Sequence, residues 1–361
     1  HYPLRRQRQM CIRDRSRCFQ RSGRATVRRR EESRLIKGLN PWGKVATRRI
    51  LSIDGGGIRG IIPAMVVAHI EKQTGTAARD LFDLIVGTSS GGITALGLSL
   101  PGTGRPFRFA ARRLVRLFDN QGKHIFERSL WRKVRSVGGV LEGSYSHEAL
   151  EGVLRKHFGA SNLGDCSVPT MVTAYDIRNR KTVFLKSWSP KYSQIKCASA
   201  ARATTAAPTF FDPAELAWDN STRLLIDGAI FINSPAVSAY AEACELYSGD
   251  VIKLLSLGTG EVTGSVDANE TASESNARIV MTLLDSIFDG VAKAADKQMI
   301  SFLKDRYLRI QTRLDLASDD IDDASKDNIE ALKFSAKKMI EKHKASLEAY
   351  FIDKPLTTAL T

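Results

Sequence analysis

The 361-residue sequence contains no run of 18 or more apolar residues, so it predicts no membrane-spanning helix. Its five cysteines are irregularly spaced and form no C-x-x-C pair, which argues against a disulfide framework and a cysteine-based metal site. Few and idle thiols are typical of a reducing compartment. We therefore expect a cytoplasmic protein whose contact with membranes, where it occurs, is peripheral.

Net charge is nearly absent from most of the chain, although the formal total is +15. Residues 1–49 hold 16 Lys and Arg against 3 Asp and Glu, which leaves 38 against 36 for the rest. The basic arm, residues 1–47, lacks apolar periodicity and the apolar segment of a signal peptide, so we expect it to be disordered. Such an arm could attract nucleic acid or an anionic membrane surface. Its stretch MCIRDR resembles a translated adapter sequence, so we favour a cloning or assembly origin for residues 1–17 and expect no nucleic-acid partner.

Strand and helix patterns alternate along the remaining chain. Strands are predicted at 48–57, 168–177, 181–188, 223–229, 251–260 and 306–314, and segment 81–100 predicts a strand, a sharp turn and a helix. Helices are predicted at 58–75, 108–136, 146–159, 195–208, 234–247, 277–304 and 326–350. This alternation indicates a three-layer α/β/α sandwich around a mostly parallel sheet. We expect one domain at 48–315 and a helical extension at 316–361 that packs on it.

The first candidate site is a serine turn. Gly87-Thr88-Ser89-Ser90-Gly91 has the pattern G-x-S-x-G, with the apolar run FDLIV before it and the helical run GITALGL after it. This context, strand then turn then helix, is that of a nucleophile elbow. Ser89 is therefore the predicted nucleophile, and Gly87 and Gly91 allow the backbone to bend tightly. The alternative is a chance match in a glycine-rich loop.

A glycine turn precedes it. Segment 54–60, DGGGIRG, contains G-x-G-x-x-G, which also occurs in dinucleotide-binding folds. The acidic residue expected about 20 positions later in such folds is missing, because EKQTGTAARD occupies that place. Free backbone amides in this turn, together with Arg59, could instead stabilise an oxyanion beside Ser89. A purely structural tight turn remains the third reading.

A serine nucleophile requires a base, and the histidines supply one poorly. Only His343 follows Ser89 after a plausible acid, as in the Ser-acid-His order of α/β-hydrolases, and it lies in an evenly charged helix. Asp227 is better placed, at the end of the run LLI and before Gly228. A partly desolvated carboxylate there has a raised pKa and can accept the serine proton directly. The alternative is a turn-forming or capping aspartate.

Taken together, these motifs resemble those of the patatin-like phospholipases. The resemblance rests on DGGGIRG, on GTSSGG and on DGA at 227–229, in this order, and extends over residues 49–315. ARATTAAPTFF at 201–211 and LLSLGTG at 254–260 are similar to further stretches of bacterial members. It implies that Ser89 is the nucleophile, that Asp227 is the base and that Gly56, Gly57 and Arg59 line the oxyanion hole.

The resemblance also implies an activity. Members of the family hydrolyse fatty-acyl esters of lipids without a metal or other cofactor, at a membrane or micelle surface. The headgroup stays open between phospholipid, lysophospholipid and galactolipid, and the apolar segments 183–188 and 208–218 are either acyl-channel walls or core. Two alternatives remain: a Ser-His-Asp esterase or peptidase with His343 as its base, and a non-catalytic lipid- or nucleotide-binding module that uses DGGGIRG for phosphate.

Overall fold

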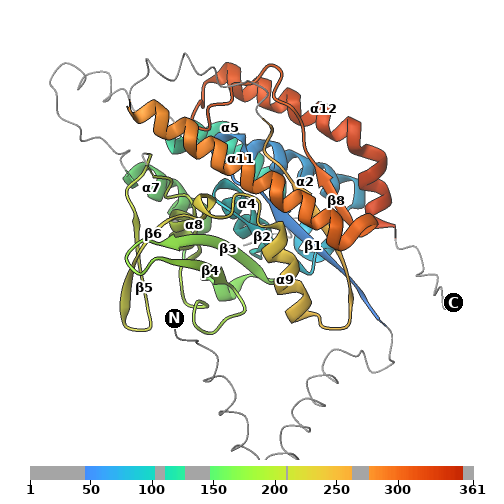
Figure 1. The fold of residues 1–361 in the computed structure, drawn as a ribbon, viewed down its shortest axis with the longest axis horizontal. Helices are drawn as coiled ribbons and strands as arrows, with labels where there is room; N and C mark the ends of the chain where they lie inside the picture. The colour runs from blue at the N-terminus through green and yellow to red at the C-terminus, as the bar shows by residue number, and fades with distance from the viewer. Residues whose placement is uncertain (1–44, 102–109, 127–146, 209, 262–275, 353–361) are drawn as a thin grey trace, which may run out of the picture.

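The computed structural model describes residues 45–101, 110–126, 147–208, 210–261 and 276–352 (Figure 1). The predicted basic arm therefore lies outside the described residues, except for positions 45–47. The described parts form a central sheet with helices on both faces.

Within the described residues the sheet has eight strands, and most of its strand pairs are parallel. The strands are β1 (Thr47–Ile53), β2 (Leu84–Gly87), β3 (Thr170–Asp176), β4 (Lys181–Lys186), β5 (Ala214–Trp218), β6 (Ser221–Asp227), β7 (Val251–Leu257) and β8 (Tyr307–Ile310). Their order is β5-β6-β3-β2-β1-β7-β8, with β4 paired to β3. The block β3-β2-β1-β7-β8 is parallel, whereas β4, β5 and β6 join it by antiparallel pairs.

Helices cover both faces, which makes three layers (Figure 1). They are α2 (Ile61–Thr74), α3 (Ala78–Leu81), α4 (Ser90–Ser99), α5 (Ala110–Phe126), α7 (His147–Phe158), α8 (Cys197–Thr204), α9 (Ala236–Leu246), α11 (Asn276–Leu303) and α12 (Lys326–Phe351). Short 3-10 turns η1 (Gly57–Gly60) and η3 (Gly228–Ile230) follow β1 and β6. The predicted three-layer α/β/α sandwich with a mostly parallel sheet is confirmed.

Alternate residues of the central strands face the two layers, because side chains of a strand point to opposite faces. Leu51 and Ile53 of β1 belong to the core shared with α2, α4, α5 and α12. Ile50 of β1 and Leu84 of β2 belong to a second core shared with α9 and α11. These strands are apolar on both faces, as expected for buried parallel strands.

The C-terminal helix α12 packs against α2 and buries Leu332, Ala336 and Met339. The sheet itself reaches Ile310 at the end of β8. The predicted division between a domain at 48–315 and an extension at 316–361 stays a prediction. No helix within the described ranges combines the length and apolar character needed to cross a bilayer.

Several local predictions need correction. The sequence analysis missed β5, which forms a hairpin with β6 through Asp219 and Asn220, both at positive φ. An Asp-Asn pair between two short strands favours such a two-residue turn. Helix α8 ends at Thr204, before the predicted end at 208, and the described part of the predicted 108–136 helix is α5.

Candidate active site

Ser89 occupies a strained turn between β2 and α4. Its φ is 54° and its ψ is −125°, a conformation that a residue with a side chain rarely adopts. Such strain costs about 1–3 kcal/mol and persists where the surroundings enforce it. Here the Ser89 carbonyl oxygen accepts hydrogen bonds from the amides of Gly92 and Ile93, at 2.8 and 3.1 Å. The turn therefore holds the Ser89 side chain at the N-terminal end of α4.

The two glycines that flank the serine allow this sharp turn by their lack of a side chain. A Cβ atom on Gly87 would lie 2.1 Å from the carbonyl oxygen of Gly91. A Cβ atom on Gly91 would lie 2.4 Å from the carbonyl oxygen of Ile53 at the end of β1. Both positions thus require glycine for close packing of strand, turn and helix, in agreement with the motif.

A threonine that the sequence analysis did not single out supports the elbow from the opposite side. The amide of Ser89 donates a hydrogen bond of 2.9 Å to the Thr204 hydroxyl, which is fully buried at the end of α8. Thr204 belongs to the stretch ARATTAAP, where only family resemblance drew notice to it. Its contact spans 115 positions of the chain, so no local pattern could have revealed it.

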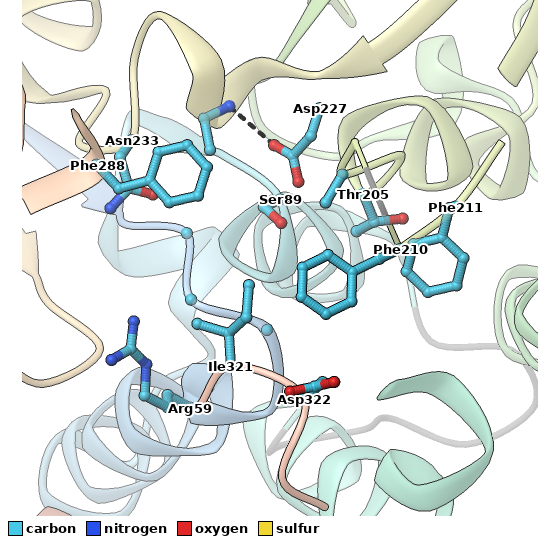
Figure 2. Close-up of a pocket in the computed structure, with 15 residues that line it drawn as sticks. Arg59, Ser89, Thr205, Phe210, Phe211, Asp227, Asn233, Phe288, Ile321 and Asp322 are labelled. Carbon is cyan, nitrogen blue, oxygen red and sulfur yellow. Dashed lines mark hydrogen bonds between the residues drawn. The ribbon is translucent and has the colours of Figure 1, made fainter. Parts of the chain in front are cut away.

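Asp227 meets Ser89 at this edge of the sheet. The Ser89 hydroxyl lies close enough to the Asp227 carboxyl group to lower its pKa, and the amide of Ala229 donates a hydrogen bond of 2.8 Å to the Asp227 Oδ1 atom. The two side chains point toward one another (Figure 2). Ala229 lies in the 3-10 turn η3, so this bond makes the Asp227 side chain the cap of that turn.

Burial raises the pKa of Asp227. Its side chain is 2% exposed, and the loss of hydration raises the pKa to about 7, although the hydrogen bonds from Ser89 and Ala229 lower it. No charged side chain of the described residues contributes to this shift. A carboxyl group with a pKa near 7 can both accept and return a proton at neutral pH.

Asp227 reaches the site from an unexpected direction. Its strand, β6, runs antiparallel to β3, with Asp227 paired to Ala174, whereas Gly87 of β2 pairs with Val172 of the same strand. Because β3 extends beyond β2, its last residues pair with β6 instead. Asp227 lies at the carboxyl end of its strand, as Gly87 does at the end of β2, although β6 runs antiparallel to β1 and β2.

The glycine loop after β1 lies against the serine elbow. A Cβ atom on Gly55 would lie 3.1 Å from the Ser89 Cβ atom, so the two backbones are in direct contact. Gly57 has a φ of 56°, and a Cβ atom there would lie 2.0 Å from the carbonyl oxygen of Ile321. Neither the Gly56 nor the Gly57 amide makes any of the backbone hydrogen bonds described for this loop. These two amides are therefore available to a ligand.

Arg59 is placed differently from these glycines. Its amide donates to the Gly56 carbonyl oxygen at 3.0 Å, and its guanidinium donates to the Asp319 carbonyl oxygen at 3.2 Å. In Figure 2 its guanidinium lies away from Ser89. Arg59 lines the pocket with its neighbours, but the predicted oxyanion role of its side chain finds no support in this geometry. The contacts favour a role in shaping the glycine loop.

The loop is anchored to the sheet by a buried ion pair. Asp54, directly after β1, accepts a 2.6 Å hydrogen bond from the guanidinium of Arg309 on β8, which also donates to Ser256 at 2.8 Å. Burial raises the pKa of Asp54, whereas the charge of Arg309 lowers it; in turn, Asp54 raises the pKa of Arg309. Because Arg309 donates to Asp54 at this short distance and is also held by Ser256, both members of the ion pair stay charged.

A largely apolar pocket opens above Ser89. Phe210, Phe211, Phe288 and Ile321 contribute to its walls, together with Gly55, Gly56, Gly57, Arg59, Ser89, Thr205, Ala207, Asp227, Ala229, Asn233 and Asp322 (Figure 2). The cavity has a volume of about 40 Å³, room for only a few water molecules. Phe288 and Ile321 come from regions to which the sequence analysis gave no site role.

No histidine occurs among these pocket residues. Of the histidines whose side chains the structure describes, His69 lies on α2, His157 on α7 and His343 on α12. His343 is half-buried against the backbone of Gln311, and burial lowers its pKa. Among the described residues no cluster of three or more His, Cys, Asp or Glu could hold a metal ion.

The comparisons with known proteins agree with these motifs. A family model described as patatin-like phospholipase matches residues 51–240, which include the glycine loop, Ser89 and Asp227. Patatin-T5 of Solanum tuberosum is 31% identical over 326 residues, 78% of this chain and 81% of that protein. Patatin-like protein 1 of Arabidopsis thaliana is 31% identical over 338 residues, 81% of each chain.

Among solved structures, VipD from Legionella pneumophila matches 84% of this chain and 69% of its own, with 14% identity and a TM-score of 0.36.

Proposed function

We propose, from the premise that this chain belongs to the patatin-like phospholipase family, that it hydrolyses fatty-acyl esters of lipids with a serine–aspartate dyad. Family membership supports lipid acyl hydrolysis in general. The observation that carries the finer proposal is the position of the Ser89 hydroxyl beside the buried carboxyl group of Asp227, in a pocket that both residues line. Ser89 is the nucleophile and Asp227 the base.

In the first step Ser89 attacks the ester carbonyl carbon while the Asp227 carboxylate accepts the hydroxyl proton. The protonated Asp227 then donates that proton to the departing alcohol, which leaves the acyl group on Ser89. In the second step Asp227 accepts a proton from water, the hydroxide attacks the acyl carbon, and Ser89 regains its proton as the fatty acid leaves. A pKa of about 7 suits a group that must take up and release a proton in each cycle.

In both steps negative charge develops on the carbonyl oxygen of the acyl group. The Gly56 and Gly57 amides are the proposed donors to it, since both line the pocket and neither is used by another backbone group of the loop. Ser89 also stands at the N-terminus of α4, where unpaired amides and the helix dipole favour negative charge. Arg59 acts indirectly in this scheme, through its hydrogen bond to the Gly56 carbonyl oxygen.

The aromatic wall of the pocket favours an acyl chain as the group next to the ester. Phe210, Phe211 and Phe288 supply apolar surface close to Ser89 (Figure 2). The present volume of about 40 Å³ is far below the ~300–1,000 Å³ of typical ligand pockets. Substrate entry therefore requires these side chains, or the segments that carry them, to move.

An activated-serine probe tests the nucleophile. A fluorophosphonate should label the wild-type protein, and mass spectrometry of the labelled peptide should place the adduct on Ser89. Ser89→Ala should abolish labelling, whereas Ser90→Ala, the matched control one position away and fully buried, should retain it. Labelling that survives Ser89→Ala would place the nucleophile elsewhere.

A lipid assay tests the substrate class. Purified wild-type protein should release free fatty acid from mixed phospholipid vesicles, and Ser89→Ala should not. Wild-type protein that binds the vesicles, reacts with no probe and releases no fatty acid would support the lipid-binding module instead. Activity on short soluble esters alone would refute the lipid substrate while leaving the dyad in place.

A further inference from the structure

The stretch LLSLGTG, at the end of β7, has no part in the catalytic scheme so far. Strands β7 and β1 are parallel neighbours, with Leu257 paired to Ile53, so the loops after them leave the sheet side by side. The amide of Asp54 donates to the Leu257 carbonyl oxygen at 3.0 Å. Two residues further on, the Thr259 hydroxyl donates a 2.8 Å hydrogen bond to the Gly55 carbonyl oxygen. This bond joins residues 204 positions apart and is buried.

The glycine loop lies between Thr259 and the nucleophile. A Cβ atom on Gly55 would point at the Ser89 Cβ atom, 3.1 Å away. A Cβ atom on Gly56 would meet the Thr259 side chain, 2.4 Å from its hydroxyl oxygen and 2.7 Å from its Cβ atom. Thr259 is 4% exposed and does not line the pocket, whereas Gly56 and Ser89 both line it.

Peptide geometry connects the Thr259 bond to the proposed oxyanion donors. The Gly55 carbonyl and the Gly56 N–H belong to one planar trans peptide and point in opposite directions. A hydrogen bond that directs the Gly55 oxygen toward Thr259 therefore directs the Gly56 N–H away from Thr259, toward the side where Ser89 lies. The next peptide is held in the same way, since the Gly56 carbonyl oxygen accepts from the Arg59 amide at 3.0 Å.

Consecutive glycines make such a restraint necessary. Without Cβ atoms, the peptides between Gly55, Gly56 and Gly57 can rotate at little steric cost. A rotated Gly55–Gly56 peptide would present its carbonyl oxygen, which repels an oxyanion, in place of its N–H. Thr259 is β-branched, so its hydroxyl is confined to few rotamers and is a firm anchor.

We propose that Thr259 is a positioning residue of the oxyanion hole: its hydroxyl holds the Gly55–Gly56 peptide with the Gly56 N–H directed at the reacting carbonyl. This role rests on the proposed acyl hydrolase function. Thr259 touches neither the substrate nor Ser89, and its effect passes entirely through the peptide that it orients.

Conservative variants separate this role from simple packing. Thr259→Val keeps the shape and removes the hydroxyl, whereas Thr259→Ser keeps the hydroxyl and removes a methyl group. Thr170→Val is the matched control, because it removes a similar buried bond, from the Thr170 hydroxyl to the Val168 carbonyl oxygen at 2.9 Å, at the opposite end of β3. Loss of one oxyanion donor typically lowers kcat about 10²–10³-fold, and misdirecting one should lower it about 10–100-fold.

The kinetic pattern decides the proposal. Thr259→Val should lower kcat on a short-chain ester and the rate of fluorophosphonate labelling together, with KM changed less than about threefold. Thr259→Ser and Thr170→Val should keep kcat within about threefold of wild type. A Thr259→Val enzyme with wild-type kcat would overturn the proposal, and so would a Thr259→Ser enzyme as slow as Thr259→Val, which would indicate packing.

Two further arms keep the test decisive. If Thr259→Val does not fold, Thr259→Ala is compared with Thr259→Ser, because these two variants differ by the hydroxyl alone. Equal kcat values would overturn the proposal. A Thr259→Ala variant about tenfold slower than Thr259→Ser would support it. Wild-type protein without turnover or labelling would refute the proposed function and this role with it. An active wild type with an unaffected Thr259→Val refutes only the role of Thr259.

Discussion

Replacing Asp227 by asparagine should inactivate the protein and stabilise it at the same time. The amide keeps the shape of the side chain, and its oxygen can still accept the hydrogen bond from Ala229. It cannot accept the Ser89 proton as a carboxylate does, so turnover should fall about 10²–10⁴-fold. Removing a buried charge, however, should raise the free energy of unfolding above neutral pH.

The size of that gain follows from the pKa of Asp227. It is about 7 in the folded state and 3.8 for an ordinary aspartate. A raised pKa means that the folded state binds the proton more tightly than the unfolded state does. The carboxyl group therefore imposes no penalty below about pH 4, and an increasing one as the pH rises toward 7. At 1.36 kcal/mol per pH unit, the full penalty is about 4 kcal/mol, present above pH 7.

The assay is a comparison of wild type and Asp227→Asn by urea unfolding at several pH values. The variant should exceed the wild type by more than 1 kcal/mol at pH 5, and this difference should grow by about 3 kcal/mol by pH 8. Other titrating groups are common to both proteins, so they cancel in the difference. If unfolding is irreversible, the same order should hold for the melting temperatures.

A difference in stability that does not change with pH would refute the reasoning, because it would mean that Asp227 is not destabilised as a charge in the folded state. A variant that is less stable than wild type at pH 8 would show that the carboxylate is stabilised by contacts beyond Ser89 and Ala229. In either case the pKa of Asp227 would not be raised in the folded state, and its fitness as a base at neutral pH would be lost.

The remaining predictions concern the anchor, the histidine and the loop. Arg309→Met should lower the free energy of unfolding by about 3–5 kcal/mol in urea titrations, because it leaves Asp54 buried and unpaired; a loss below 1 kcal/mol would contradict the ion pair. His343→Ala should leave kcat/KM on a short-chain ester within a few-fold of wild type, since His343 does not line the pocket, and a dead variant would restore the triad hypothesis. Gly57→Ala should lower both kcat and the melting temperature, because its φ is 56° and the added Cβ atom would meet the Ile321 carbonyl oxygen; unchanged values would show that the loop adapts freely.

Much of the fold was predictable because its strands carry strong local signals. Apolar runs that end in glycine or aspartate predicted β1, β2, β6 and β7, and the segments that follow β1 and β2, together with Asp227, line the pocket. The motif glycines were equally readable, because both belong to the local G-x-S-x-G pattern, although the contact that requires Gly91 comes from the end of β1. The confirmed α/β/α layering follows from the alternation of such segments.

What the sequence could not predict depends on contacts between distant segments. Strand β6 pairs antiparallel with the last residues of β3, beyond β2, and this pairing joins strands far apart in the sequence, which no local pattern encodes. The same holds for the hydrogen bond of Ser89 to Thr204. Arg59 was assigned to the oxyanion hole from its place in the motif, yet its guanidinium is directed to Asp319 by the fold of a segment 260 positions away.

The two buried aspartates at this edge of the sheet show how position alone gives one residue type opposite tasks. Asp54 is paired with Arg309 and can remain charged, which suits an anchor for the glycine loop. Asp227 receives only neutral hydrogen bonds from Ser89 and Ala229, so burial raises its pKa to about 7. A cation beside Asp227 would stabilise its charge and lower its pKa, and would thereby weaken it as a base. The buried charge at this edge is therefore held by the pair of Asp54 and Arg309, whereas no charged side chain of the described residues shifts the pKa of Asp227.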